Sequence, residues 1–235
     1  MTATMIEISA GRFAMGSTRF YPEEGPVREV EVDAFAIDAG PVSVAEFGRF
    51  TAETGYATVA ERAPDPADYP DADPALLVEG SAVFHPTPGP VPLDNPGRWW
   101  AYVPGANWRH PWGPVHRREG LARHDPVGLF AANGYGLFDM TGNVWEWTCD
   151  YYSPTGAGAD ETRSPCCAPP RNPRVETPDA SYDVGRPGAH IPRRVIKGGS
   201  HLCAPSYCLR YRPAARQPEA VDTSTSHIGF RCVLR

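Results

Sequence analysis

Residues 133–148 read NGYGLFDMTGNVWEWT and combine turn-forming residues with two tryptophans. Gly and Asn are typical of a tight turn, which exposes backbone carbonyl oxygens, and Glu146 adds a carboxylate just beyond it. Calcium takes this mixture of oxygen ligands. The residues leave a second interpretation open, in which Glu146 is a buried, hydrogen-bonded side chain between two core tryptophans.

All six tryptophans of the chain lie between residues 99 and 147, on either side of this turn. Exposing so many large aromatic side chains to water is unfavourable. We therefore expect this segment to form part of the core or a binding surface.

The N-terminal part of the chain predicts strands and one helix. Residues 6–20 alternate in two short pieces around Gly11, which predicts a hairpin, and residues 27–37 alternate more clearly. Ser43 and Glu46 have the spacing of a capping box, and Gly55 is a stop signal, so we expect a helix over 44–53.

Two stretches, 63–97 and 154–192, are rich in Pro and predict long surface excursions, the first with a strand at 82–85. Beyond them, RRVIKGG and IGFRCVL in residues 193–235 predict strands. The sequence contains neither repeats nor a clear linker, which favours one irregular domain over residues 1–235.

Composition excludes several classes of protein. The 235 residues carry 28 acidic and 22 basic side chains, a net charge of −6, whereas a general nucleic-acid binder needs a basic surface. No apolar run is long enough to span a membrane, and the N-terminus lacks the pattern of a secretory signal. The expected location is therefore the cytoplasm, with neither nucleic acid nor membrane as a partner.

Cys203 and Cys208 lie in residues 198–216, GGSHLCAPSYCLRYRPAAR, with Pro205 between them. A bend at Pro205 can bring the two sulfur atoms together. Two thiolates without further ligands suit a low-coordinate Cu(I) or a reversible disulfide, because zinc and iron–sulfur sites need four ligands. Two buried thiols without a chemical role are the remaining alternative.

Basic side chains surround this pair in the sequence. They can lower the pKa of a thiol, bind an acidic partner, or simply be solvated. They are Arg210, Arg212, Arg216 and Arg231. Ser200 has neither the GxSxG context nor a His and acid in recognisable positions, so a serine hydrolase is not indicated. No phosphate-binding glycine motif is present, which argues against nucleotide binding.

Six motifs, taken in order, resemble the formylglycine-generating enzymes of the sulfatase-modifying factor family, in particular the actinobacterial type. Two short signatures within them, GNVWEW and GFRC, mark only a wider superfamily, whereas the cysteine pair is specific to the generating enzymes. The motifs are GRFAMGS (11–17), ETGYATVAE (53–61), GANWRHPWGP (105–114), NGYGLFDMTGNVWEWT (133–148), the cysteine segment (198–216) and HIGFRC (227–232).

The resemblance implies a mixed α+β, C-type-lectin-like fold and an aerobic oxidase. Such an enzyme converts a cysteine in a Cys-X-Pro-X-Arg segment of a sulfatase into Cα-formylglycine, using O2. It implies that Cys203 and Cys208 bind Cu(I), joined by the substrate thiol, with Ser200 near the oxygen-binding pocket. Trp108 and Arg109 match the wall of the peptide groove.

The resemblance also implies a calcium ion at the turn of 133–148. Its ligands would be backbone oxygens of Thr141, Gly142 and Val144 and the carboxylate of Glu146.

The chain departs from the family between about 115 and 127, where a central block is absent. In the family, that block carries a core helix, strands and another calcium site. Its absence is expected to lower the stability of the domain and to alter the positioning of the copper ligands. Cys232 is then expected to be a free thiol. Two other functions stay open: an inactive peptide-binding remnant of the same fold, and a metal-free thiol–disulfide protein.

Overall fold

The structure is a computed structural model that describes residues 4–92, 94–114, 125–157, 168–183, 185, 190–203 and 206–235. The strands are β1 (Met5–Ile8), β2 (Gly11–Met15), β3 (Arg28–Val32), β4 (Phe35–Asp38), β5 (Gly80–Phe84), β6 (Trp100–Pro104), β7 (Trp145–Tyr151), β8 (Arg193–Lys197), β9 (Gln217–Ala220), β10 (Ile228–Gly229) and β11 (Val233–Leu234). The helices are α1 (Val44–Thr54) and the short 3-10 turns η1 (Pro22–Glu24), η2 (Val59–Glu61), η3 (Pro66–Asp68), η4 (Pro74–Leu76) and η5 (Pro96–Arg98).

The N-terminal strands form one long, interrupted antiparallel pair. β1 pairs with β4 and β2 pairs with β3, and the register is the same on both sides of the interruption. The predicted hairpin within residues 6–20 is therefore wrong, although both strands exist. Gly11 begins β2, and the chain reverses only in the segment that follows β2 and contains η1.

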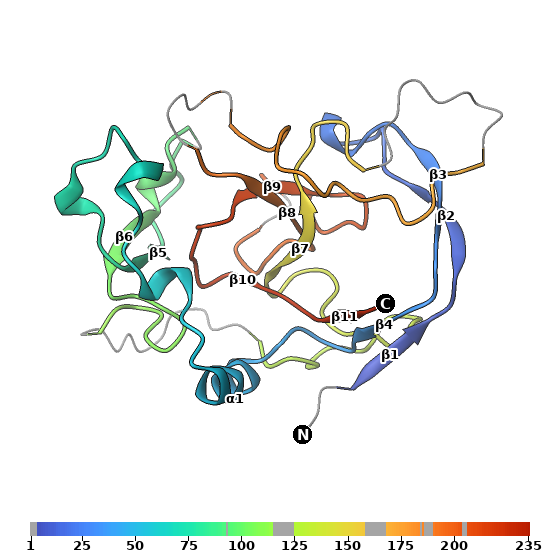
Figure 1. Ribbon diagram of the computed structural model, residues 1–235, viewed down its shortest axis with the longest axis horizontal. Helices are drawn as coiled ribbons and strands as arrows, with labels where there is room; N and C mark the ends of the chain where they lie inside the picture. Colours follow the sequence, from blue (N-terminus) through green and yellow to red (C-terminus); the bar gives the residue numbers. More distant parts are fainter. Residues whose placement is uncertain are drawn as a thin grey trace.

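A four-stranded sheet, in the order β10-β7-β8-β9, occupies the middle of the molecule. Figure 1 shows the β5–β6 pair on one side of it and the β2–β3 pair on the other. Two core side chains, Trp145 and Ile196, come from β7 and β8, with 3% and 1% of their surface exposed. Trp145 confirms that the tryptophan-rich segment contributes to the core.

The C-terminal segment connects two sheets. β10 runs parallel to β7 in the central sheet, whereas β11 pairs with β4 in the sheet of order β1-β4-β11. The single strand predicted over IGFRCVL is therefore two short strands, because residues 230–232 pass from one sheet to the other.

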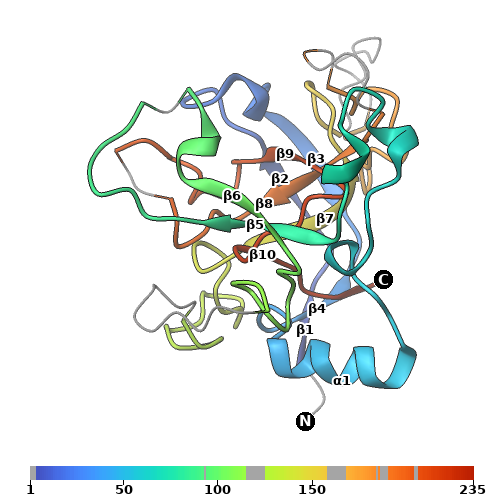
Figure 2. The same ribbon diagram turned by 90° about the vertical axis from the view of Figure 1, so that its left-hand side faces the viewer.

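Helix α1 matches the sequence prediction closely. Ser43 and Glu46 form the full capping box, with the Ser43 N–H donating to Glu46 Oε2 at 2.9 Å. Gly55 ends the helix in the left-handed region at φ 70°, where glycine is least strained. Figure 2 shows α1 along one edge of the molecule, and Phe47 packs edge-on against Trp108 with ring centroids 5.1 Å apart.

The architecture is strand-rich with few helices and belongs to the α+β class, as the sequence predicts. The excursion over 63–97 consists of short 3-10 turns and the predicted strand, which is β5. The excursion over 154–192 lies partly outside the described residues. None of the helices in the described ranges is long and apolar enough to cross a membrane.

The capping box makes a stability prediction. Ser43→Ala removes the side-chain acceptor of the Glu46 N–H, which should lower the free energy of unfolding by about 1 kcal/mol in urea denaturation at pH 7. Hydrogen bonds from Ser43 lower the pKa of Glu46, so this contribution is present above the ordinary carboxyl pKa and is lost as pH falls through the lowered one.

Glu53→Ala changes an exposed residue on the same helix. It should leave the free energy of unfolding nearly unchanged, both at pH 7 and below the lowered pKa of Glu46. Equal effects of the two substitutions would show that the capping box does not stabilise α1.

Candidate functional site

The loop that follows β8 brings Cys203 and Cys208 together. Their thiols lie close enough to interact, and both are free and partly buried. Cys203 is anchored through its N–H, which donates to the Ser200 carbonyl at 2.9 Å. The predicted approach of the two sulfur atoms is therefore present, while Pro205, to which the bend was assigned, lies outside the described residues.

The cysteine environment favours the neutral thiol. Burial raises the pKa of Cys203 to about 11; contact with Cys208 acts in the same direction, and hydrogen bonding to Ser200 opposes it. In the absence of a bound metal, Cys203 is therefore protonated at neutral pH. Metal binding would have to displace that proton.

The arginines that the sequence places around the pair have other partners. Arg210 pairs with Glu23 at 2.8 Å, and Arg212 is bound to the fully buried carboxylate of Glu24. The interpretation that these arginines lower the thiol pKa is wrong for Cys203, whose pKa is raised instead. The guanidinium groups of Arg210 and Arg212 are already paired with carboxylates of η1. Sequence spacing does not reveal partners so distant in the chain.

Two tyrosines that sequence reasoning missed hold the loop. The Tyr211 hydroxyl donates to the Ser200 carbonyl at 3.1 Å and also contacts the Cys203 carbonyl, and the Tyr207 hydroxyl binds the Leu202 carbonyl. Burial raises the pKa of Tyr211 to about 12, so it stays a donor. Both lie inside the cysteine motif, but tyrosine at these positions has no chemical signature of its own.

Glycine is required where Tyr211 crosses the loop. Gly199 has φ +72°, and a side-chain Cβ there would lie 2.9 Å from Tyr211 Cδ1. Ser200, next in the chain, is completely buried, and its Oγ accepts from the Leu202 N–H at 3.2 Å. Ser200 thus supports the loop backbone, and its predicted place near an oxygen pocket stays a prediction.

The turn of 133–148 lies directly against the cysteine loop. The Gly142 N–H donates to the Gly198 carbonyl at 2.9 Å, and the His201 N–H donates to the Asn143 carbonyl at 3.0 Å. The turn therefore positions the start of the loop that carries the thiols.

Glu146 forms an ion pair with Arg231. Arg231 Nε lies 2.6 Å from Glu146 Oε2, Arg231 Nη2 lies 2.5 Å from Oε1, and the side chains are 4% and 15% exposed. Both carboxylate oxygens therefore have a cationic partner, so Glu146 in this arrangement does not fit calcium. Calcium at Thr141, Gly142, Val144 and Glu146 stays a prediction, and the geometry matches the alternative of a hydrogen-bonded Glu146.

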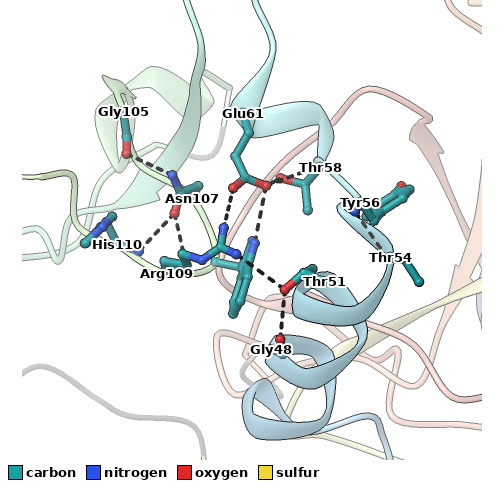
Figure 3. A network of polar contacts seen from close by, with 11 residues as sticks. Gly48, Thr51, Thr54, Tyr56, Thr58, Glu61, Gly105, Asn107, Arg109 and His110 are labelled. Atoms are coloured by element: carbon teal, nitrogen blue, oxygen red, sulfur yellow. Dashed lines mark hydrogen bonds and ion pairs between the residues drawn. The ribbon is translucent and has the colours of Figure 1, made fainter.

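The described contacts of Trp108 and Arg109 are with α1 and η2, and not with the cysteine loop. Figure 3 shows Arg109 pointing to Glu61, with Nη1 2.8 Å from Oε1, and Trp108 Nε1 donates to the same carboxylate at 3.3 Å. The Arg109 guanidinium lies over the indole ring at 4.2 Å, and its side chain is 47% exposed. The pair is therefore a partly exposed surface element held by Glu61, and its role as a groove wall stays a prediction.

Within the part of the chain that the structure describes, no three His, Cys, Asp or Glu side chains come together as a metal site. A four-ligand zinc centre is therefore not formed by these residues. The two thiols of Cys203 and Cys208 are a soft donor pair, and this set fits Cu(I).

Comparison with known proteins supplies the family. The chain matches the sulfatase-modifying factor enzyme 1-like domain over residues 1–124 and 93–235. The chain belongs to this family.

Two curated relatives span nearly the whole chain. A formylglycine-generating enzyme of Mycobacterium tuberculosis is 38% identical over 306 aligned positions, covering 99% of this chain and 98% of that enzyme. One of Thermomonospora curvata is 34% identical, covering 97% and 92%. An alignment of 306 positions exceeds the 235 residues of this chain, so it places positions of the mycobacterial enzyme opposite gaps.

A solved structure has the same fold. PvdO from Pseudomonas aeruginosa aligns with a TM-score of 0.57 at 21% identity, over 98% of this chain and 94% of that one. The family fold therefore extends over the described residues, whereas residues 115–124, where the sequence indicates a shortened stretch, lie outside them.

The buried ion pair makes a second prediction. Arg231→Met should lower the free energy of unfolding by about 3–5 kcal/mol, because it leaves the Glu146 carboxylate buried without a partner. Arg171→Met, which breaks the exposed pair with Asp33, should have little effect in the same denaturation experiment. If both variants lose little stability, Glu146 must have another partner.

The environment of the thiols makes a third prediction. Iodoacetamide at pH 8 should alkylate the exposed Cys149 faster than Cys203, and the rate at Cys203 should rise toward pH 11 as its thiolate forms. Peptide mass mapping over time measures both sites. In urea the difference should disappear; equal rates in the folded chain would contradict the burial of Cys203.

Proposed function

We propose that this chain oxidises a cysteine of a sulfatase to Cα-formylglycine within a Cys-X-Pro-X-Arg segment, using O2 and Cu(I). The observation that carries the proposal is the close approach of the free, partly buried thiols of Cys203 and Cys208 in a chain whose named relatives are formylglycine-generating enzymes.

Cys203 and Cys208 would hold copper through their sulfur atoms, each giving up its proton on binding. When bound there, Cu(I) supplies a soft centre at which a substrate thiol and dioxygen can meet. The chain's own contribution is to keep the two sulfur atoms close before metal arrives. Tyr211 and Ser200 do this by fixing the loop backbone from Ser200 to Cys203.

Complete reduction of O2 takes four electrons, and oxidation of the substrate cysteine supplies only two of them. One O2, two electrons and two protons convert the –CH2SH group of the substrate cysteine to –CHO, releasing hydrogen sulfide and water. The Cβ–S bond breaks and a C=O bond forms, so carbon is oxidised and O2 is reduced. A thiol reductant, oxidised to its disulfide, is the class of co-reactant that supplies the electrons.

Trp108 and Arg109 are proposed to contact the peptide segment of the sulfatase. Their support is physical: a carboxylate and a helix hold both side chains in place while leaving nearly half of the Arg109 side chain in solvent. A preorganised aromatic and cationic surface loses little entropy when it binds an extended peptide. Ser200 is proposed to line the oxygen-binding region beside the thiols.

Calcium belongs to the proposal only as an expectation from resemblance. Binding at Thr141, Gly142, Val144 and Glu146 would require Glu146 to leave Arg231. No step of the reaction is assigned to this ion.

The fourth prediction concerns the two thiols. The chain loaded with Cu(I) should convert a Cys-X-Pro-X-Arg peptide to the aldehyde, with O2 and a thiol reductant, as followed by mass spectrometry. Cys203→Ser and Cys208→Ser should each lower kcat/KM by at least about 10³-fold, because a single thiolate does not complete the soft donor pair. Cys149→Ser, at an exposed thiol on β7, should retain wild-type turnover.

Full turnover in either loop variant would refute the assignment of the copper ligands. A folded chain that binds copper and peptide without conversion would favour an inactive peptide-binding remnant of the fold. A reversible Cys203–Cys208 disulfide without copper binding would favour the thiol–disulfide alternative, for which contact between the thiols is the supporting observation.

A further inference from the structure

A cavity of about 520 Å³ lies between β2, β7, β8 and the segment after Arg212, and neither Cys203 nor Cys208 lines it. Part of its wall is apolar. This part is formed by Phe13, Met15, Phe20, Tyr151, Val175 and Val195. The remaining wall carries several cations, which is unusual for a cavity with so much apolar surface.

Arg28 on β3 is the first of these cations and lacks acceptors. Its Nη2 donates to the Thr155 carbonyl at 3.0 Å, but Nε and Nη1 are buried and have no partner in the described part of the chain. A buried charged donor without an acceptor is costly. Burial lowers the pKa of Arg28, which reflects the same missing compensation.

Arg216 and Lys197 add two more cations to the same wall. Arg216 donates to three backbone carbonyls, and Lys197 Nζ donates to the carbonyls of Pro213 and Ala215 at 2.7 and 2.8 Å. An ammonium group has three donors, so one remains on Lys197. Burial lowers the pKa of Lys197 to about 8, and repulsion from Arg216 contributes.

Gly156 marks the place where the two guanidinium groups converge. A Cβ on Gly156 would lie 2.8 Å from Arg28 Nη2 and 3.4 Å from Arg216 Cζ. The charge of Arg28 also lowers the pKa of Arg216, although burial is the larger cause. Like charges are thus held close together on one wall.

The carboxylates that line the cavity have hydrogen-bonding partners other than these three cations, although the charge of Glu24 still acts on Lys197 and Arg216. Glu24 is bound to Arg212, and Asp150 accepts from Arg174 Nε at 2.6 Å. Arg28, Arg216 and Lys197 therefore face the cavity without a carboxylate partner among the described residues.

We propose that this cavity binds a small organic anion, with its carboxylate or phosphate group at Arg28, Arg216 and Lys197 and its apolar body against Phe13 and Phe20. A guanidinium binds either group by donating paired, charge-assisted hydrogen bonds, and Arg28 Nε and Nη1 lack partners among the described residues. Because both nitrogen atoms are buried, the ligand would bind them as the Arg28 side chain shifts toward the cavity. The apolar wall excludes water from the remainder of the ligand. This proposal does not rest on the oxidation reaction.

Calorimetric titration of the full chain tests the proposal with benzoate and phenyl phosphate. Their neutral counterparts, benzamide and benzyl alcohol, and inorganic phosphate are the comparison probes. At least one organic anion should bind saturably at one site, and Arg28→Met should weaken that binding at least ten-fold. Arg12→Met, which alters an exposed arginine on the paired strand β2, should bind like the wild type.

Thermal unfolding separates lost binding from lost folding. Without ligand, Arg28→Met should unfold at the wild-type temperature or above, because it removes a buried charge that lacks acceptors; the anion should then stabilise the wild type and Arg12→Met only. Absence of saturable binding to the wild type, equal affinity in Arg28→Met, or equal affinity for benzoate and benzamide would overturn the proposal. Inorganic phosphate that binds as tightly as phenyl phosphate would overturn the assignment of an organic ligand.

Discussion

The ion pair between Glu146 and Arg231 is the interaction on which the rest of the structure depends. Arg231 lies in the segment that leaves the central sheet after β10 and joins the outer sheet at β11. Its guanidinium binds Glu146 on β7 and also donates to the Phe138 carbonyl at 3.0 Å. One buried side chain therefore connects both sheets to the turn that supports the cysteine loop.

The sequence predicts local structure here better than long-range pairing. Helix α1 is recognisable because its signals, Ser43, Glu46 and Gly55, act within a few residues of one another. The hairpin was misplaced because alternation around Gly11 identifies strands but not their partners. The register is decided by β3 and β4, some twenty residues further along the chain, and alternation carries no information about them.

The same distinction applies to the site. The approach of Cys203 and Cys208 could be anticipated because both lie in one short loop. The partners of the arginines could not be anticipated, because Glu23 and Glu24 lie nearly two hundred residues earlier in the chain. Arg210 and Arg212 form ion pairs with these carboxylates. The cationic cavity is missed for another reason: arginine side chains are mostly exposed, whereas Arg28 lies on the same face of β3 as the buried Val30, and its guanidinium lies against Thr155 and Gly156.

The cysteine loop is supported from both sides of the stretch near 115–127, where the sequence indicates that the chain is shortened: by the turn of 133–148 and by the segment around η1. Gly142 and Asn143 hold the start of the loop, and Glu23 and Glu24 bind the arginines that follow Cys208. Trp108 and Arg109 precede that stretch and depend instead on Glu61 and α1. The cysteine pair and the Trp108–Arg109 pair thus have separate supports.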